Sequence, residues 1–352
     1  MKKTILIAAA LSGLLLDACK KDASGSAAVD NCQLAEVITT GTADIGSPDP
    51  YTINTTERLT YNDQHLLSGF SSQSQGKYSS NKIYTYNSNY SYQYDANGYL
   101  LKDILQTSGR DAAGKTNSRN YTNDYTYVNK RLIRKQQSYT AADDGKTSSG
   151  GSTLAYEYNA DGKLSKYSFS YTNSDGSGGS SFTTYEYSGG KLSKLTYSDG
   201  RGGTVTPLIE VNTQGLMTKN VSGTTDFRYQ YDAAGNLVRT EQYSAGKKTD
   251  ISVYETDGKQ NAAAMFYPAF KGHPDIDFYM GRNSTYSFTG NLLKDERIYV
   301  DGAGVEKTSA GFYFTYTYNA HNLPSTSTRI YKNSDGKIIQ QSASSYTYTN
   351  CN

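Results

Sequence analysis

Histidine and carboxylate residues are the first candidates for chemistry in this chain of 352 residues. The three histidines are dispersed, and none belongs to a zinc-ligand spacing such as HExxH or CxxC. His273, Asp275 and Asp277 offer a small nitrogen-and-oxygen metal site, although turn chemistry explains the two aspartates more simply. The sequence shows no nucleophile-elbow phrase and no phosphate-cradling glycine loop. We therefore expect no enzyme, no cofactor and no bound metal.

Two of the three cysteines lie near the two ends of the repeat-bearing part of the chain, at Cys32 and Cys351. An oxidising compartment permits a disulfide between them. Such a bridge closes a loop of more than 300 residues, which the chain-entropy account values at about 5 kcal/mol. The alternative is two unpaired thiols at frayed ends. Free exposed thiols are a liability outside the cell, and this favours the bridge.

The N-terminal residues 1–18 have the organisation of a secretory signal peptide. Lys2 and Lys3 precede an apolar stretch from Ile5 to Leu16. That stretch is too short to cross a hydrocarbon core of ~30 Å as a helix, which takes ~20 apolar residues. A cleaved signal therefore fits better than a membrane span, and we expect the rest of the chain to be exported.

The run Leu16-Asp17-Ala18-Cys19 resembles the lipobox of bacterial lipoproteins, in which the cysteine is diacylated and becomes the N-terminus. Leu16 and Ala18 match that pattern, while Asp17 departs from it. The resemblance implies a lipid on Cys19 and a place at the outer membrane or cell surface. Residues 20–30 are small and polar, so we expect 19–31 to form a flexible tether that begins at the lipidated cysteine. Two acyl chains give stable anchoring where one gives only marginal binding. The alternative is an ordinary signal peptide that a cysteine follows by chance.

The composition favours strands. Hydrophobic residues make up only 36% of the chain, yet tyrosine alone contributes 34 residues and tryptophan is absent. Tyrosine and threonine pack well on pleated surfaces. The net charge is +2 with both signs interspersed, and the sequence has no basic stripe of the kind that phosphate binding needs. Nucleic acid is therefore not an expected partner.

One phrase recurs along the chain: Tyr-x-Tyr, a turn rich in Asn or Asp and often Gly, then x-Leu. The clearest copies are YQYDANGYLLK (92–102), YEYNADGKLSK (156–166), YEYSGGKLSK (185–194) and YQYDAAGNLVR (229–239), with looser copies at 58–68, 125–134, 286–294 and 316–325.

Each copy of the phrase reads as a β-hairpin. Tyrosines two apart, such as Tyr92 and Tyr94, share one face of a strand. The turn residues supply a glycine able to take a positive φ, and the leucine begins the returning strand. A lone hairpin is marginal in water, so about ten of them should stack and bury a tyrosine and leucine face. We expect an all-β fold, an antiparallel meander of repeated β-hairpins that forms an open curved sheet or a partly closed barrel.

The phrase resembles the YD repeats of Rhs and teneurin-type shell proteins, whose core is close to Tyr-x-Tyr-Asp-x-x-Gly-x-Leu. Residues 92–100 and 229–237 match it nearly letter for letter, and 156–164 has Asn159 in place of the aspartate. The chain also resembles small repeat-bearing lipoproteins of Gram-negative bacteria. It has too few repeats to enclose a folded cargo as the large shell proteins do. The resemblance implies one repeat domain over 32–352.

Residues 257–285 break the repeat with an alanine run, two prolines and several aromatic residues. We expect an insertion, with at most one helical turn, that covers a face or edge of the sheet. Irregular aromatic loops often carry function, so Tyr267, Phe270 and Tyr279 are the candidate ligand-binding residues. The alternative is a cap over an otherwise exposed strand edge.

Two functions of different class fit these features. In the first, the chain is a non-enzymatic binding or adhesion module of the cell envelope, with a carbohydrate as the expected ligand and the membrane bound through the N-terminal lipid. Tyrosines beside asparagine and aspartate suit sugar faces and hydroxyls. In the second, the sheet is a structural or assembly scaffold for another envelope protein.

Overall fold

The computed structural model describes residues 32–259, 265, 271–273 and 290–351. These residues are all-β, and no α-helix occurs among them. The strands are β1 (Gln33–Ala43), β2 (Tyr51–Tyr61), β3 (Leu67–Tyr78), β4 (Ile83–Tyr94), β5 (Leu100–Arg110), β6 (Thr116–Val128), β7 (Arg131–Asp143), β8 (Lys146–Tyr158), β9 (Leu164–Asn173), β10 (Gly178–Ser188), β11 (Lys191–Ser198), β12 (Thr204–Val205), β13 (Leu208–Val211), β14 (Met217–Ser222), β15 (Thr225–Tyr231), β16 (Leu237–Ser244), β17 (Lys247–Thr256), β18 (Leu292–Val300), β19 (Glu306–Tyr318), β20 (Pro324–Asn333) and β21 (Ile338–Thr349).

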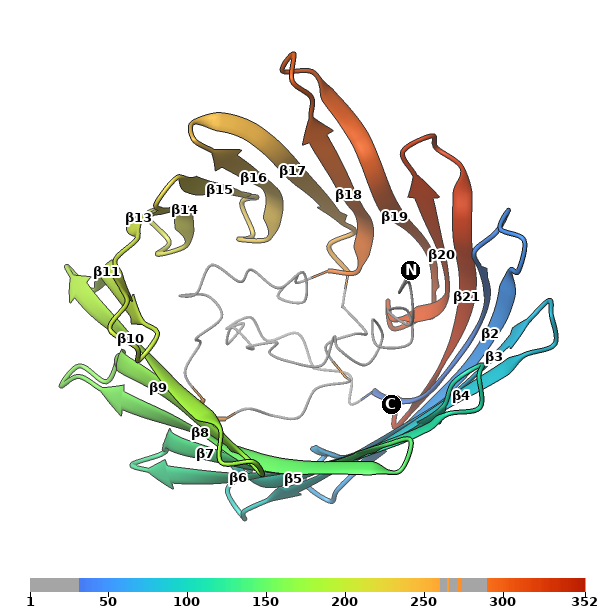
Figure 1. Ribbon diagram of the computed structural model, residues 1–352, viewed down its shortest axis with the longest axis horizontal. Helices are drawn as coiled ribbons and strands as arrows, with labels where there is room; N and C mark the ends of the chain where they lie inside the picture. The colour runs from blue at the N-terminus through green and yellow to red at the C-terminus, as the bar shows by residue number, and fades with distance from the viewer. Residues whose placement is uncertain (1–31, 260–264, 266–270, 274–289, 352) are drawn as a thin grey trace.

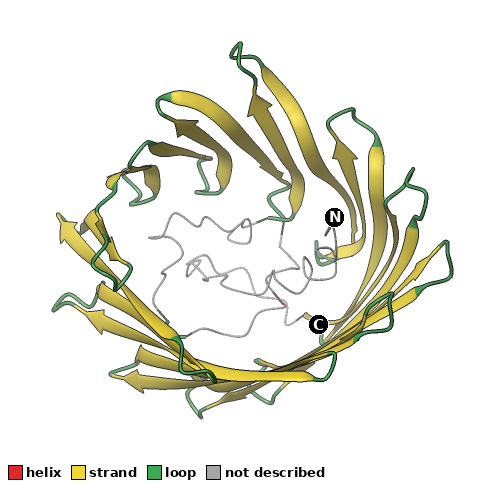
Figure 2. Ribbon diagram, in the orientation of Figure 1, coloured by secondary structure: helices red, strands yellow, loops and turns green. Residues whose placement is uncertain are grey.

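The strands form one antiparallel meander in a sheet of 21 strands. With one exception, each strand pairs with the next strand in the chain, and β21 pairs with β1 in a ladder from Gln33↔Thr349 to Ala43↔Gln340. The sheet therefore curls into a ring in which the first and last strands lie side by side (Figure 1). Figure 2 shows strands alternating with turns around the whole ring. The expected meander of hairpins in a curved sheet is confirmed.

The exception lies between β12 and β13, where the described residues form no ladder and the ring is not closed. β12 contributes only two pairs to β11, Tyr197↔Val205 and Ser198↔Thr204. Pro207 follows two residues after the end of β12, and a proline has no backbone N–H to donate to a ladder. The side chains of Val205 and Leu208 are exposed at this seam. The proline explains why the hairpin pattern stops here.

The turn of the repeat has the same geometry in several copies, and residues 94–100 illustrate it. The Asp95 side chain accepts hydrogen bonds from the N–H groups of Asn97 and Tyr99, both at 2.8 Å. Gly98 has a φ of 80°, where an L side chain is strained. Two degenerate copies put His65 and Asn322 at this position, with φ values of 60° and 57°. The turn geometry therefore persists where the glycine is lost.

A β-bulge follows each of these turns and gives the second tyrosine of the phrase its role. The register shifts between Gln93 and Tyr94, so that Tyr94 lies opposite Leu100. The Tyr94 hydroxyl donates to the backbone carbonyl of Leu67 on the preceding strand at 2.9 Å. The same bond recurs in five further copies, from Tyr61 to Leu34, Tyr127 to Leu100, Tyr158 to Leu132, Tyr187 to Leu164 and Tyr231 to Met217. These bonds tie neighbouring turns together along one end of the ring.

The leucines and first tyrosines of the phrase form the core. The larger cluster of buried residues follows β5 to β16 along one end of the ring and includes Leu100, Leu132, Leu164 and Leu237. A second cluster, around Leu34, Leu59 and Leu67, lies where β1 to β3 meet. The core is therefore a band rather than a compact centre, as expected when each unit buries its face only against its neighbours.

The face opposite the core tyrosines carries ion pairs directly across neighbouring strands. Glu186 follows the buried Tyr185, so it points away from it, and it pairs with Lys194 at 2.7 Å. Equivalent pairs join Glu157 to Lys166 and Glu36 to Arg58. Exposed pairs of this kind contribute little stability, but opposite charges across a ladder support the register.

The carboxylate of Glu241 is the most heavily bonded of these charges, and it gives a pH prediction. Burial opposes its ionisation, but hydrogen bonds from Lys248, Tyr243 and Arg239 outweigh burial and lower its pKa to about 2. The folded pKa lies below the ordinary value of a glutamate. The Glu241 carboxylate therefore adds to the free energy of unfolding above about pH 4.5, and this contribution is lost as the pH falls towards 2.

We expect Glu241→Gln to destabilise the protein at pH 7 and the difference from the wild type to shrink between about pH 4.5 and pH 2. Urea unfolding at a series of pH values measures this difference. Glu186→Gln, at an exposed pair, serves as the control and should change stability little at any pH. A difference for Glu241→Gln that stays constant down to pH 2 would contradict the assignment.

Candidate ligand-binding surface on the concave face

Several residues singled out by the sequence lie outside the described residues. These are Cys19, the candidate ligand-binding residues Tyr267, Phe270 and Tyr279, and the two aspartates considered beside His273, Asp275 and Asp277. The lipid on Cys19 and the role of the three aromatic residues stay predictions.

The described segment 271–273 of the irregular insertion lies inside the ring (Figure 1). The carbonyl of Gly272 accepts a hydrogen bond from the N–H of Leu132 at 2.8 Å. The Lys271 ammonium donates to the carbonyl of Asn97 at 2.9 Å and lies 4.8 Å from the centre of the Tyr99 ring. These contacts place the segment against the strands and turns at β4 to β7 and identify the concave face there.

His273 is packed against aromatic rings on this concave face. One of its ring nitrogens is 2.8 Å from the Tyr127 hydroxyl, and its ring centre is 5.3 Å from that of Tyr125. Burial, together with the positive charge of Lys135, lowers the pKa of His273 to about 3. The imidazole is therefore neutral at physiological pH, and its visible role is to pack the segment onto the sheet.

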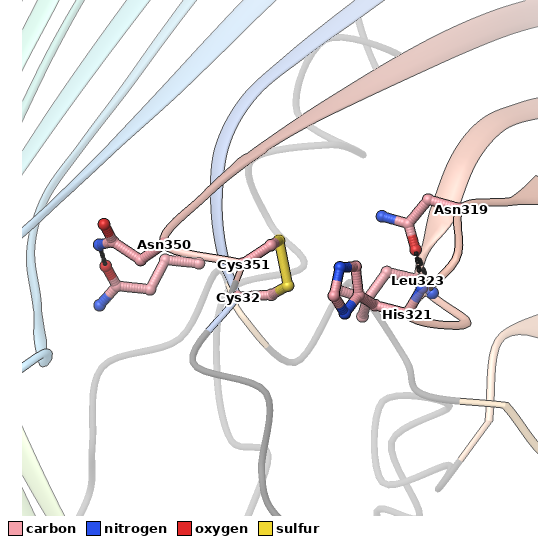
Figure 3. The surroundings of a disulfide bond; sticks show 7 residues. Cys32, Asn319, His321, Leu323, Asn350 and Cys351 are labelled. Carbon is pink, nitrogen blue, oxygen red and sulfur yellow. Dashed lines mark hydrogen bonds between the residues drawn. A yellow bond between two sulfur atoms is a disulfide. The ribbon is translucent and has the colours of Figure 1, made fainter.

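Cys32 and Cys351 are joined by a disulfide in the structure, with their Cα atoms 4.2 Å apart and a sequence separation of 319. Figure 3 shows the imidazole of His321, from the turn between β19 and β20, beside this bond. The disulfide lies next to the β1–β21 ladder that joins the two ends of the chain.

The most suggestive polar cluster lies on three neighbouring strands, at Asp103 of β5, Asn123 of β6 and Gln137 of β7. The register places Asp103 opposite Asn123 and Asn123 opposite Gln137, so all three share one face. Asn123 donates to Asp103 at 2.8 Å, and Gln137 donates to Asn123 at 3.0 Å. The Tyr125 hydroxyl donates to the other Asp103 oxygen at 2.5 Å. Because Tyr125 contacts His273, this row of amides and carboxylate lies on the concave face.

Aromatic rings border this row on the same face. Tyr121 and Tyr139 lie directly opposite one another in the ladder, two residues from Asn123 and Gln137. Their ring centres are 5.9 Å apart with an interplanar angle of 30°. Both side chains are half-buried. The Tyr139 hydroxyl donates to the side chain of Asn173 on β9 at 3.2 Å. We call Asp103, Asn123, Gln137, Tyr121 and Tyr139 the polar–aromatic row.

The row combines two kinds of recognition. Amide and carboxylate groups offer donors and acceptors in fixed positions, and hydrogen bonds within the row fix their orientation. Tyrosine rings offer flat apolar surface with a polar edge. Small-molecule sites typically pair such surface with a few convergent polar groups. The arrangement suits a ligand that has both apolar faces and hydroxyl groups.

Sequence reasoning missed this row because none of its members belongs to the recurring phrase. Asp103, Asn123 and Gln137 lie 20 and 14 residues apart, and only the strand register brings them together. One signal was available. Asp103 is two residues from Leu105 and therefore shares its strand face, so a carboxylate stands where the pattern calls for an apolar side chain.

Among the described residues, no helix has the length and apolarity to cross a membrane. No family model matches the chain, and no curated protein matches it.

Two solved structures resemble the chain. A porin-like protein from Bacteroides uniformis is 14% identical, with a TM-score of 0.31 over 90% of this chain and 96% of that chain. The TcdB2-TccC3 structure is 13% identical, with a TM-score of 0.19 over 81% of this chain and 18% of that chain. Both TM-scores are too low to support a function, and the YD-repeat resemblance stays a prediction.

Proposed function

We propose that the chain is a lipid-anchored protein of the outer membrane or cell surface that binds a carbohydrate, without catalysis, on the concave face of its sheet. The polar–aromatic row carries this proposal. Its half-buried tyrosine pair supplies a stacking surface for a sugar ring, and its amides and carboxylate supply hydrogen bonds to sugar hydroxyls.

The location of the row supports binding better than a purely structural role. Asp103 and Asn123 are only 9% and 6% exposed and are held by hydrogen bonds, whereas Tyr121 and Tyr139 are more accessible. Fixed polar groups beside accessible rings need little reorganisation when a ligand binds, and such preorganisation favours affinity.

The test is a binding screen of the purified full chain against glycans and polysaccharides, followed by calorimetric titration of the strongest ligand. We expect saturable binding that Tyr121→Ala and Tyr139→Ala each weaken at least tenfold, or about 1.4 kcal/mol. Tyr299→Ala, at a tyrosine of β18 that is 40% exposed, is the matched control and should bind as the wild type does. An equal loss of affinity in all three variants would contradict a binding role for the polar–aromatic row.

The absence of binding across a broad panel would favour the alternative function, an assembly scaffold of the outer envelope. The cross-strand ion pairs on the opposite face, such as Glu186 with Lys194, give that function a charged surface for partners. Partner capture from envelope extracts would then be the next measurement.

The anchor is tested separately from the ligand. We expect the wild-type chain to incorporate labelled palmitate and to fractionate with membranes, and Cys19→Ser to do neither. Incorporation that persists in Cys19→Ser would overturn the proposed anchor and leave the ligand-binding proposal untouched.

A further inference from the structure

Three metal-ligating side chains converge where the two ends of the sheet meet. The sulfur atoms of Cys32 and Cys351 and a ring nitrogen of His321 all lie within 4.8 Å of one another. Figure 3 shows the imidazole facing the disulfide across a short gap. In the oxidised chain the two sulfurs are bonded to each other and cannot serve as thiolate ligands. When that bond is reduced, both sulfurs become able to act as thiolate ligands beside the imidazole.

The two cysteines are held in place by more than their own bond. Gln33, next to Cys32, and Thr349, two residues before Cys351, begin a β1–β21 ladder that continues to Ala43 and Gln340. The side chain of Asn350 also donates to that of Gln33 at 2.6 Å. These backbone and side-chain bonds do not depend on the disulfide. Reduction should therefore leave the two thiols facing each other.

The imidazole is positioned by its own turn. The Asn319 side chain accepts hydrogen bonds from the N–H groups of His321 and Leu323, both at 3.0 Å. The N–H of Asn319 in turn donates to the carbonyl of Leu323 at 2.9 Å. Leu323 is 1% exposed, which fixes the turn to the core. The histidine is thus held next to the cysteines by β19 and β20 rather than by the chain ends.

We propose that the reduced chain binds a thiophilic divalent cation of the zinc class through Cys32, Cys351 and His321, with water in the fourth position. A dithiol transfers two electrons and two protons to the disulfide, becomes a disulfide itself, and leaves two cysteine thiols. The cation then displaces the two thiol protons, which go to solvent.

The required geometry is close to the one observed. Tetrahedral zinc takes sulfur at ~2.3 Å and nitrogen at ~2.0 Å, which places the two sulfurs roughly 3.8 Å apart. Once the S–S bond is broken the two sulfurs are free to separate to that distance, and a ring nitrogen of His321 lies within 4.8 Å of both. Two thiolates balance the charge of the cation. The metal then takes over the role of the disulfide and joins β1 to β21.

The experiment uses the full chain with Cys19→Ser, which removes the third cysteine of the sequence. The protein is reduced with a phosphine and titrated with cobalt, whose thiolate complexes absorb in the ultraviolet and visible. We expect one cobalt per chain in the reduced protein, displacement by zinc, and no binding by the oxidised protein. Zinc should also recover part of the thermal stability lost on reduction.

His321→Ala tests the third ligand, with His65→Ala as the control at a histidine of another turn. Both variants keep the disulfide, so they can be folded oxidised and reduced afterwards, with circular dichroism to check the fold. We expect His321→Ala to weaken cobalt binding at least tenfold and to abolish the stabilisation by zinc, and His65→Ala to change neither.

His321→Asn is the second variant if His321→Ala does not stay folded after reduction, because asparagine suits turns. Equal cobalt binding by the oxidised and reduced chains would overturn the proposal. The same holds if neither His321 variant differs from His65→Ala, or if the reduced chain gains no stability with zinc.

Discussion

Reduction of the Cys32–Cys351 disulfide, with a chelator present to remove metal, is expected to lower the free energy of unfolding by about 2 to 5 kcal/mol. The bond closes a loop of 319 residues, so it restricts the unfolded chain strongly. The native state keeps the β1–β21 ladder after reduction, and the loss therefore comes from the unfolded chain's regained freedom.

Urea unfolding of the Cys19→Ser chain, with and without reductant, measures this change. We expect the midpoint to fall, and Cys351→Ser to unfold at the reduced midpoint without any reductant. A midpoint that reduction leaves unchanged would show that the ladder alone holds the chain ends.

Leu100→Ala is expected to cost about 3 to 4 kcal/mol, because Leu100 is fully buried and its removal leaves a cavity in the main core cluster. The backbone carbonyl of Leu100 also accepts a hydrogen bond from the Tyr127 hydroxyl. A shift of the backbone at Leu100 would weaken this bond and the neighbouring turn, so the loss of stability should be large.

The adjacent residue provides a matched control for this measurement. Leu101 is 42% exposed, and Leu101→Ala removes the same atoms from an exposed position of the same strand. We expect it to cost at most about 1 kcal/mol. Similar losses for both variants would mean that the band of buried leucines is not the main source of stability.

The local structure could be predicted from the sequence because the residues within each repeat are enough to favour its hairpin. In 92–102, paired tyrosines, an Asx-type turn, a glycine and a leucine each favour the same hairpin, and the structure has β4, a turn and β5 there. The role of Tyr94 could not be predicted. Its hydroxyl bonds to the carbonyl of Leu67, and that contact depends on a bulge that the residue types do not reveal.

Arrangements that depend on distant register were beyond the sequence. The polar–aromatic row requires β5, β6 and β7 to align so that Asp103 meets Asn123, and an offset of one residue would send these side chains to opposite faces. The approach of His321 to the two cysteines likewise requires the ring to return β19 to β21 beside β1. The spacing of these residues along the chain predicts neither the polar–aromatic row nor the contact of His321 with the two cysteines.

The pairing of β1 with β21 limits the order in which the strands can pair during folding. The other described ladders join neighbouring strands in sequence, so they can form one after another as the chain emerges. One edge of β1 can pair only after β21, more than 300 residues later in the chain, has been synthesised. Non-local contacts of this kind slow folding because loop closure must come first. Until then β1 presents an open edge, the kind of surface on which proteins aggregate, so the chain is most exposed to misassembly before β1 pairs with β21.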